Sequence, residues 1–382
     1  NAYAATQERE SLSYGIYSWN NSTVTVKDSV SVTSYAFSQN GDSTSYGILS
    51  GQNSNVVLSG EGQMLSAART NADDTDVYSY GMLVERNSSV TVSNRLDIAA
   101  QADAAGKDPS QLVAYGINAE SDSSVILNYG SIHAEVQHTE AAGTSTAYGV
   151  SLGGNSSFSM QEGSIVAIAN TDPHYSGGTD GDAVGIMTNS GGDSYKISLG
   201  TVNVDARGRN ASGMELAHAE LDMAGGTIIA QTSTGQAMGV NANSQTTFTG
   251  TGDIDLMAYG RTGSAVGLHA EGNSSITVGG GLLYSYTDDG NATGLEADSG
   301  GSITKTGGEE FLVYSLTGNA IGLDAKDSSS ASRYPASKIT YGNADGTSQI
   351  LVVAGGEAYG IRAENAVDTS DGQSATVELM NG

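Results

Sequence analysis

Two serines could act as nucleophiles, because each follows a glycine and an aspartate in the tripeptide GDS, at residues 41–43 and 192–194. A nucleophilic serine needs a general base within hydrogen-bond reach and an acid that orients this base. The five histidines stand in unrelated segments without a partnering motif, and the sequels GDSTS and GDSYK match neither secreted esterases nor the GDSGS of secreted serine proteases. The sequence therefore does not favour a serine hydrolase.

Carboxylates are the second source of chemistry, and most of them stand in expected loops. Sugar lyases and hydrolases need a cluster of acids in a groove on one sheet. Glu215, Asp222, Asp253 and Asp255 lie on or beside expected strands, but no spacing pairs them. We therefore predict a non-enzymatic protein without catalytic residues. The alternative is a carbohydrate-active enzyme, either a polysaccharide lyase or a glycoside hydrolase like those of phage tailspikes.

Acidic clusters could also hold Ca²⁺, a hard ion that prefers oxygen ligands. Asp73, Asp74 and Asp76 form one such cluster, and GGTDGDAVG at 177–185 is a single imperfect copy of a calcium-binding nonapeptide that normally occurs in tandem. Solvated acidic loops are the default explanation of both segments. We predict no cofactor and no metal site, with Ca²⁺ as the open alternative.

The charge of the chain excludes several classes of partner. The sequence carries 42 acidic and 15 basic residues, a net charge of −27. Such a surface repels phosphate backbones, so we predict no nucleic-acid partner. Cysteine is absent, which excludes disulfides and thiol chemistry. No apolar run is long enough for a membrane helix and no signal peptide is expected. The chain also begins within the pattern, with NAYAATQERE, so it reads as a mature or trimmed piece of something larger.

A repeated glycine between two aromatic or aliphatic residues organises the whole chain. Successive glycines are 32 to 36 residues apart up to Gly185, then 26 to 28 apart up to Gly322, with 38 residues before the last. A period of this size is typical of solenoids and repeat arrays. The repeated positions are Gly15, Gly47, Gly81, Gly116, Gly149, Gly185, Gly213, Gly239, Gly267, Gly294, Gly322 and Gly360.

Each repeat holds three short runs in which apolar and polar residues alternate, such as AVGLHA, SSITVGG and LLYSY from residue 265 onward. Alternation with period two predicts strands. Three strands per repeat predict an all-β protein, a single-stranded right-handed parallel β-helix (solenoid) of about twelve three-strand coils, stacked ~4.8 Å apart into a rod of roughly 60 Å. We expect one domain over 1–382, with long corner loops in 14–185, compact coils in 186–322, and one long insertion in 323–382.

Two features of the repeat predict packing rather than chemistry. We expect the residues on either side of the glycine to face inward, with the glycine outward or at a bend where a side chain would clash with the next coil. Asn-Ser-Ser segments before the second run predict turns, because asparagine tolerates left-handed backbone angles. The inward column forms a structural core ladder of Tyr14, Tyr46, Tyr80, Tyr115, Tyr148 and Tyr359.

The long inserts of the first five intervals all fall between the third run and the next glycine, and would form a ridge at one corner. Insertions that map to one face of a repeat protein often mark a binding face, although solvated loops that shield a sheet edge are an equal alternative. The candidate binding residues of this ridge are Asp42, Asp73, Asp74, Asp76, Asp103, Asp108, Glu140, Asp172, Asp180 and Asp182.

Short Gly-Ile and Gly-Leu coils, Asn-Ser-Ser turns, an acidic surface and the lack of cysteine resemble the passenger domain of a bacterial autotransporter adhesin (type Va secretion) of the self-associating type. The resemblance covers nearly all 382 residues and rests on the style of the repeat. It implies export across the outer membrane, display at the cell surface or outside the cell, and fusion in the full-length protein to an outer-membrane β-barrel.

The function implied by this resemblance is adhesion, seen as bacterial aggregation, biofilm formation or host attachment. The partner would be a second copy in trans, or a receptor or glycan on a host or neighbouring cell. A net charge of −27 opposes self-pairing unless Ca²⁺ or low pH screens it, so both kinds of partner stay open.

Overall fold

The protein is all-β in its described part. The computed structural model describes residues 1–6, 10–104, 110–138, 144–169, 181–307, 310–327, 335–342, 349–365 and 374–380, and no helix occurs among them. The chain divides into two compact units. Unit 1 comprises Asn1–Ser198 and Ala206–Arg209, and unit 2 comprises Leu199–Asp205 and Asn210–Gly382, so the border runs within strand β15 (Tyr195–Gly208).

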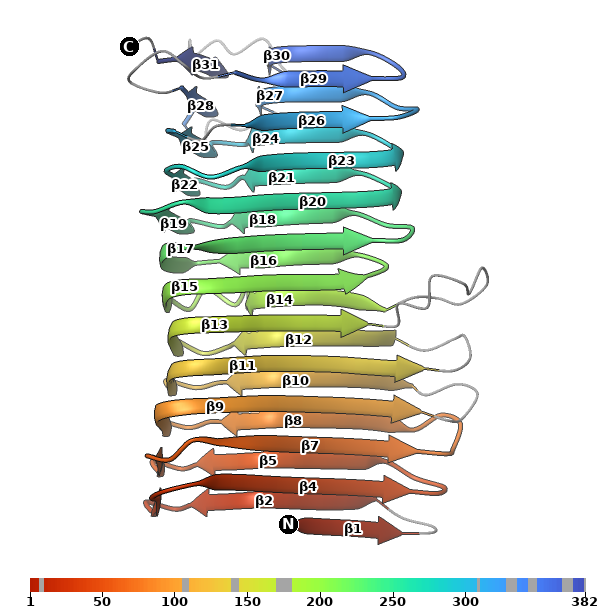
Figure 1. Ribbon diagram of the computed structural model, residues 1–382, viewed down its shortest axis with the longest axis vertical. Helices are drawn as coiled ribbons and strands as arrows, with labels where there is room; N and C mark the ends of the chain where they lie inside the picture. Colours follow the sequence, from red (N-terminus) through yellow and green to blue (C-terminus); the bar gives the residue numbers. More distant parts are fainter. Residues whose placement is uncertain are drawn as a thin grey trace. The chain divides into compact units, whose positions relative to one another are not determined.

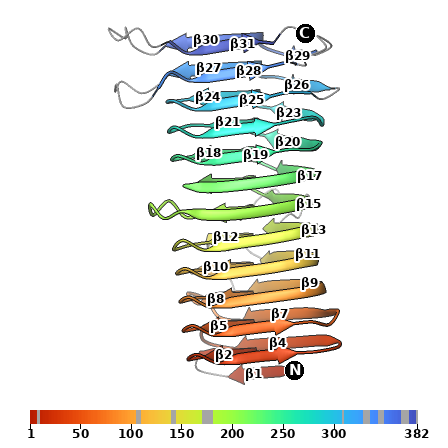
Figure 2. The same ribbon diagram turned by 90° about the vertical axis from the view of Figure 1, so that its left-hand side faces the viewer.

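Unit 1 contains two parallel sheets, and each repeated glycine lies in the first of them. Figure 2 shows the strands of this first sheet lying one above another. They are β2 (Ser11–Trp19), β5 (Ser43–Gly51), β8 (Asp76–Val84), β10 (Gln111–Ala119), β12 (Thr144–Leu152) and β14 (Asp182–Thr188). The second sheet contains β1 (Ala2–Thr6), β3 (Thr23–Val26), β4 (Val30–Ser38), β6 (Asn55–Leu58), β7 (Gly62–Thr70), β9 (Ser89–Ala104), β11 (Ser124–His138) and β13 (Ser157–Ala169), of which β4, β7, β9, β11 and β13 stack in Figure 1.

Unit 2 repeats this arrangement of strands. Its glycine-bearing strands are β16 (Ala211–Ala217), β18 (Ala237–Asn243), β21 (Ala265–Ala270), β24 (Ala292–Asp298), β27 (Ala320–Asp327) and β30 (Ala358–Asn365). Its other sheet contains β17 (Ala219–Thr232), β19 (Thr247–Gly250), β20 (Ile254–Thr262), β22 (Ser275–Val278), β23 (Leu283–Asp289), β25 (Ser302–Lys305), β26 (Phe311–Ser315), β28 (Lys338–Tyr341), β29 (Leu351–Ala354) and β31 (Thr376–Leu379).

The register places equivalent residues of successive coils directly opposite one another. Tyr46 pairs with Tyr80 and Ile48 with Met82, while in unit 2 Leu268 pairs with Leu295. The pairings of the described strands are parallel, which is the stacking expected of a parallel β-helix. The predicted fold class is therefore confirmed.

The second and third strands of a coil are not always separate. They remain two strands in the first two coils, but β9, β11 and β13 are continuous strands of 16, 15 and 13 residues. Within β11 the pairing register shifts between Leu127 and Tyr129, and Gly130 has a φ of 145°. The chain therefore turns at this glycine without leaving the hydrogen-bond ladder, and the expectation of three strands in every coil is wrong here.

The core of the inner coils contains the aliphatic residue after the repeated glycine, whereas Ile361 in the last coil is exposed. In unit 1 Ile48, Met82, Ile117 and Val150 have no exposed surface, and Leu268 in unit 2 is equally buried. The glycine itself bends close to the next coil. A Cβ on Gly47 would lie 2.5 Å from the carbonyl oxygen of Gly81 and 2.7 Å from Sδ of Met64, so only glycine fits.

The prediction that the tyrosine ladder lies in the core is wrong. The rings do stack, with centroids 5.1 Å apart for Tyr14 and Tyr46 and 5.0 Å apart for Tyr115 and Tyr148, as also for the intervening pairs. Their edges, however, face the outside, and Tyr14 is 37% exposed. In unit 2, Tyr359 is likewise exposed. The bend at the glycine is the cause, because it turns the glycine and its successor inward while the preceding tyrosine points outward.

The Asn-Ser-Ser segments and the related Asn53-Ser54-Asn55 form the expected turns. Asn53, Asn87, Asn155 and Asn273 all have φ near 60°, the left-handed region that asparagine tolerates. The serine hydroxyl that follows accepts a hydrogen bond from the backbone N–H of its counterpart in the preceding coil, as Ser88 Oγ does from Ser54 N at 3.1 Å. These turns therefore hold consecutive coils at a fixed spacing.

Candidate functional site

The predicted acidic ridge is only partly described, and it is not one site. Asp108, Glu140, Asp172 and Asp180 lie outside the described residues. Asp76 and Asp182 are the first residues of strands β8 and β14, and Asp103 lies within β9, so these three are strand residues rather than loop residues. The strands are longer than the sequence predicts, because the ladder between coils continues into the segments expected to be loops.

Asp42 and Asp76 are the described ridge residues that interact with each other. Asp42 Oδ1 accepts a hydrogen bond of 2.9 Å from the backbone N–H of Asp76. Burial, with a smaller contribution from the charge of Asp42, raises the pKa of the Asp76 carboxyl. Asp73 and Asp74 are both exposed in the connection after β7. This arrangement concentrates some negative charge at the corner but leaves it open to water.

Two further ridge carboxylates are neutralised by arginines of their own unit. Asp103 Oδ2 lies 3.3 Å from Nε of Arg69, and Asp182 Oδ1 lies 3.1 Å from a guanidinium nitrogen of Arg209. Among the residues that the structure describes, no group of three or more acidic or histidine side chains is arranged to hold a metal ion. The described ridge therefore offers scattered, partly paired charges.

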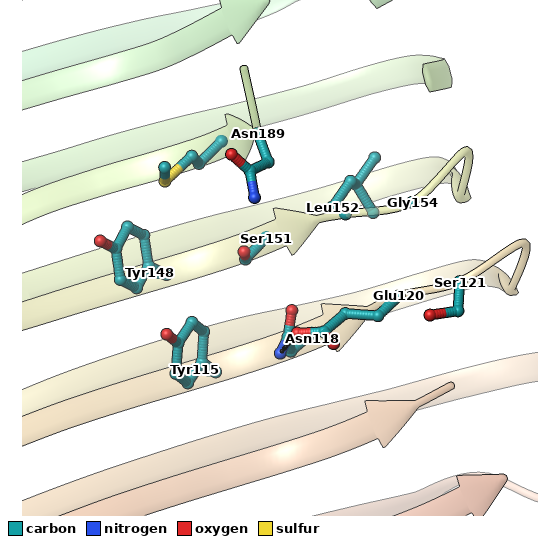
Figure 3. A pocket seen from close by; sticks show the side chains of 11 residues that line it. Tyr115, Asn118, Glu120, Ser121, Tyr148, Ser151, Leu152, Gly154 and Asn189 are labelled. Atoms are coloured by element: carbon teal, nitrogen blue, oxygen red, sulfur yellow. Dashed lines mark hydrogen bonds between the residues drawn. The ribbon is translucent and has the colours of Figure 1, made fainter. Parts of the chain in front are cut away.

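A shallow polar pocket lies instead on the outer face of unit 1, over the ends of β10, β12 and β14 (Figure 3). Its volume is about 320 Å³. The lining combines amides, hydroxyls, one carboxylate and two glycines of the turns. The lining residues are Tyr115, Asn118, Glu120, Ser121, Tyr148, Ser151, Leu152, Gly153, Gly154, Met187 and Asn189.

The hollow has a simple cause in the residues two positions after each repeated glycine, which we call the Gly+2 column. In unit 1 this column consists of Tyr17, Leu49, Leu83, Asn118, Ser151 and Met187, paired coil to coil. Ser151 has the shortest side chain of the column and stands between the longer Asn118 and Met187. The face of the sheet is therefore recessed at this one coil, as the sticks of Asn118 and Ser151 show in Figure 3.

The backbone around the pocket is fixed by the ladder between coils. The N–H of Glu120 donates to the carbonyl of Val84 at 2.8 Å, and the N–H of Gly153 donates to that of Ala119 at 2.8 Å. The N–H of Asn189 likewise donates to Leu152 at 3.0 Å. These bonds continue past the strand ends, so the turns that carry the polar side chains are held in place.

Within the pocket, Asn118 orients the carboxylate of Glu120. Asn118 is only 5% exposed, and its Nδ2 donates a hydrogen bond of 2.9 Å to Oε1 of Glu120. The Tyr115 hydroxyl stays protonated across the physiological range, because burial and the neighbouring Tyr148 and Glu120 raise its pKa to about 12. The pocket thus offers preorganised donors and acceptors.

In unit 2 the same Gly+2 column is an ion-pair network rather than a recess. It contains Glu215, Asn241, His269, Glu296, Asp324 and Arg362. The ring nitrogens of His269 lie 3.7 Å from Glu271 and 3.7 Å from Glu296, and Glu296 also pairs with Lys326. Arg362 Nε donates to Asp324 Oδ1 at 2.8 Å. The charged groups of the column from His269 to Arg362 are therefore paired with opposite charges.

Paired charges shift the pKa values within this network. Burial alone would lower the pKa of His269, but Glu271 and Glu296 outweigh it and raise the value to about 9. Burial would raise the pKa of Glu296, but His269 and Lys326 outweigh it and lower the value to about 2. Both groups are therefore charged at neutral pH.

Of the pocket residues, the sequence predicts a role only for Tyr115 and Tyr148, as members of the core ladder, and none for the polar residues around them. Asn118, Glu120, Ser151 and Asn189 belong to three runs of ordinary strand and turn residues, and no local motif joins them. The pocket can be recognised in the sequence only when the repeats are aligned on their glycine. In that alignment the Gly+2 position changes from leucine to a polar residue at Asn118 and Ser151.

The comparisons with known proteins returned no match, whether with protein families, curated proteins or solved structures. Among the described residues, no helix is long and apolar enough to span a membrane.

Proposed function

We propose that the protein is a non-enzymatic cell-surface adhesin that attaches through the outer faces and corners of its coils. The observation that carries the proposal is the pocket over β10, β12 and β14, a shallow polar recess whose turns are held by hydrogen bonds between coils. Rigid, solvent-facing polar groups suit the recognition of a partner surface, because little order has to be gained on binding.

The pocket does not favour hydrolysis or elimination on a sugar. Most glycoside hydrolases act with two carboxylates that flank the scissile bond. Glu120 is the one carboxylate among the residues that line the pocket, and its hydrogen-bond partner Asn118 cannot act as an acid. The geometry therefore supports binding better than turnover.

The remaining parts of the proposal rest on the style of the repeat and on charge. We propose export across the outer membrane as part of an autotransporter, with display at the cell surface. The partner is a receptor or glycan on another cell rather than a second copy, since a net charge of −27 opposes the approach of two like surfaces.

The experiment is an attachment assay with beads that carry the full chain. We expect beads to attach to host or neighbouring cells, while beads alone do not aggregate in physiological salt. Aggregation of the beads among themselves would show that self-pairing is the adhesive mode. Release of oligosaccharides from a polysaccharide panel, lost in Glu120→Gln, would replace the adhesin by the carbohydrate-active enzyme, and failure to attach to any cell would refute the proposal.

A further inference from the structure

We infer that the pocket over β10, β12 and β14 binds one neutral hexose unit of a glycan. This inference rests on the proposed function and gives it a ligand class. The size of the pocket is the first argument. A volume of about 320 Å³ is at the lower end of the ~300–1,000 Å³ typical of ligand sites, so it suits one sugar ring of a chain that continues into solvent.

The kind of polar group is the second argument. A hexose presents several neighbouring hydroxyls, each of which donates and accepts a hydrogen bond. The pocket contains groups that likewise both donate and accept hydrogen bonds, namely the amides of Asn118 and Asn189 and the hydroxyls of Ser121 and Ser151. The carboxylate of Glu120, held by Asn118 at 2.9 Å, supplies acceptors for sugar hydroxyl protons. Met187 adds an apolar wall for the C–H groups of the ring.

Charge decides which sugars are accepted. Glu120 is the one ionic group of the lining, and the protein as a whole carries a charge of −27. Both repel the carboxylates of sialic or uronic acids and the sulfates of sulfated glycans. A neutral hexose is therefore preferred over an anionic one.

A lysine side chain of a protein partner is the competing ligand, since Glu120 could pair with its ammonium group. The lining argues against it. A single exposed carboxylate that already accepts a hydrogen bond gives an exposed ion pair, which contributes little in water. The surrounding amides and hydroxyls would also go unused by a lone ammonium group.

The test fills the recess without disturbing the fold. Ser151→Met places in the pocket the residue that the next coil carries at the same position, Met187. Leu49→Met is the matched control, because it makes the same new side chain in the same column two coils outside the recess. Circular dichroism and thermal melting establish that both variants fold like the wild type.

Binding is measured by titration with neutral hexose-terminated oligosaccharides, with sialylated and sulfated ones, and with a lysine-rich peptide. We expect one or more neutral glycans to bind, Ser151→Met to weaken this binding at least tenfold, and Leu49→Met to leave it unchanged. Glu120→Gln keeps an acceptor oxygen and is expected to weaken the binding of neutral glycans by less than tenfold.

Three results would overturn the inference. They are preference for anionic glycans, equal binding by Ser151→Met and wild type, and binding of the lysine-rich peptide that Glu120→Gln abolishes. If no glycan binds while chain-coated beads still attach to cells, the hexose site is refuted and the adhesin stands. If the beads also fail to attach, the proposed function falls as well.

Discussion

The repeated glycine is the residue on which the stacking of coils depends most directly. A Cβ on Gly322 would lie 2.5 Å from the carbonyl oxygen of Gly360 in the next coil, a distance that forces the backbone to shift. A Cβ on Gly360 itself would meet no atom of the described residues within 4 Å. A Cβ therefore has no room at Gly322 but has room at Gly360, in two adjacent coils of unit 2.

This contrast gives a prediction with an internal control. Gly322→Ala should destabilise the protein by about 1–3 kcal/mol, the usual range for an overpacked site. Gly360→Ala should change the free energy of unfolding by less than about 0.5 kcal/mol, as for most surface substitutions. Urea unfolding followed by circular dichroism measures both, and equal stability of the two variants would contradict the close approach at the glycine.

His269 ties stability to pH, because its pKa is about 9 in the folded protein and 6.5 in the reference state. The raised value means that its stabilising contribution is complete below pH 6.5 and is lost as the pH rises toward 9. Glu296, with a pKa of about 2, contributes fully above pH 4.5 and loses this contribution as the pH falls. The network should therefore stabilise unit 2 most between about pH 4.5 and 6.5.

His269→Gln should accordingly cost about 1–3 kcal/mol near pH 6 and much less near pH 9.5. The control is His133→Gln. His133 lies 3.4 Å from Glu135, but its side chain is 34% exposed against 16% for His269, so the cost should be small at both pH values. Urea unfolding at the two pH values measures the difference, and a cost for His269→Gln that does not depend on pH would show that the ion pairs are not its source.

The tyrosines show which part of a residue's role could be predicted. Their recurrence correctly predicts columns of stacked rings. The predicted side of the sheet on which the rings lie was wrong, because alternation with period two assumes a regular pleat. In unit 1 Gly47 and Ile48 are both buried while Tyr46 is half-buried, so the phase of the pattern changes at the glycine. A bend made possible by the missing Cβ is not visible in a count of apolar residues.

At the scale of the element, a chain of serine hydroxyls crosses the interior of the first coils of unit 1. Ser34 Oγ donates to Ser13 Oγ at 2.8 Å, Ser45 to Ser34 at 3.1 Å, Ser66 to Ser45 at 2.9 Å and Ser79 to Ser66 at 3.2 Å. All five are almost fully buried. In later coils the position of Ser79 is taken by alanine, as at Ala114, Ala147 and Ala183.

Replacing one serine should therefore destabilise the protein by more than one fifth of the cost of replacing all five. Ser45→Ala takes a partner from both Ser34 and Ser66, and we expect a loss of about 1–3 kcal/mol, the cost of an unsatisfied buried polar group. Replacing all five serines by alanine leaves no orphaned hydroxyl and should cost less than the sum of the five single changes. Urea unfolding of the five single variants and of the fivefold variant measures these losses. A fivefold loss equal to the sum of the single losses would contradict a connected chain of hydrogen bonds.

The turns and strands were more predictable than the candidate site. Asn-Ser-Ser specifies its turn within three residues, and alternation specifies a strand within six, so local sequence suffices for both. The pocket depends on the side chains of three coils, and it exists because Ser151 is shorter than Asn118 and Met187 on either side. Only alignment of the repeats in the correct register could have revealed it.

Across the whole molecule, the same repeated coil carries different surface chemistry at different positions along the chain. The Gly+2 column forms a recess in unit 1 and an ion-pair network in unit 2, although both are built on the same bend. The bend at the repeated glycine recurs from coil to coil, while the outer positions vary. This is the physical basis for proposing that the protein works as a scaffold with a binding surface and not as an enzyme.

The parallel stacking of like residues is the claim on which every other conclusion rests, and engineered disulfides test it directly. The chain has no cysteine, so introduced pairs report without background. Thr25 faces Val57 in unit 1, and Thr277 faces Thr304 in unit 2. Neighbouring strands lie ~4.8 Å apart, and a disulfide needs Cα atoms ~4.4–6.8 Å apart. Thr25→Cys with Val57→Cys, and Thr277→Cys with Thr304→Cys, should therefore oxidise readily to intramolecular disulfides. Thr25→Cys with Asn55→Cys, two residues out of register, should not. Efficient closure of the shifted pair, or failure of both registered pairs, would contradict the stacked coils.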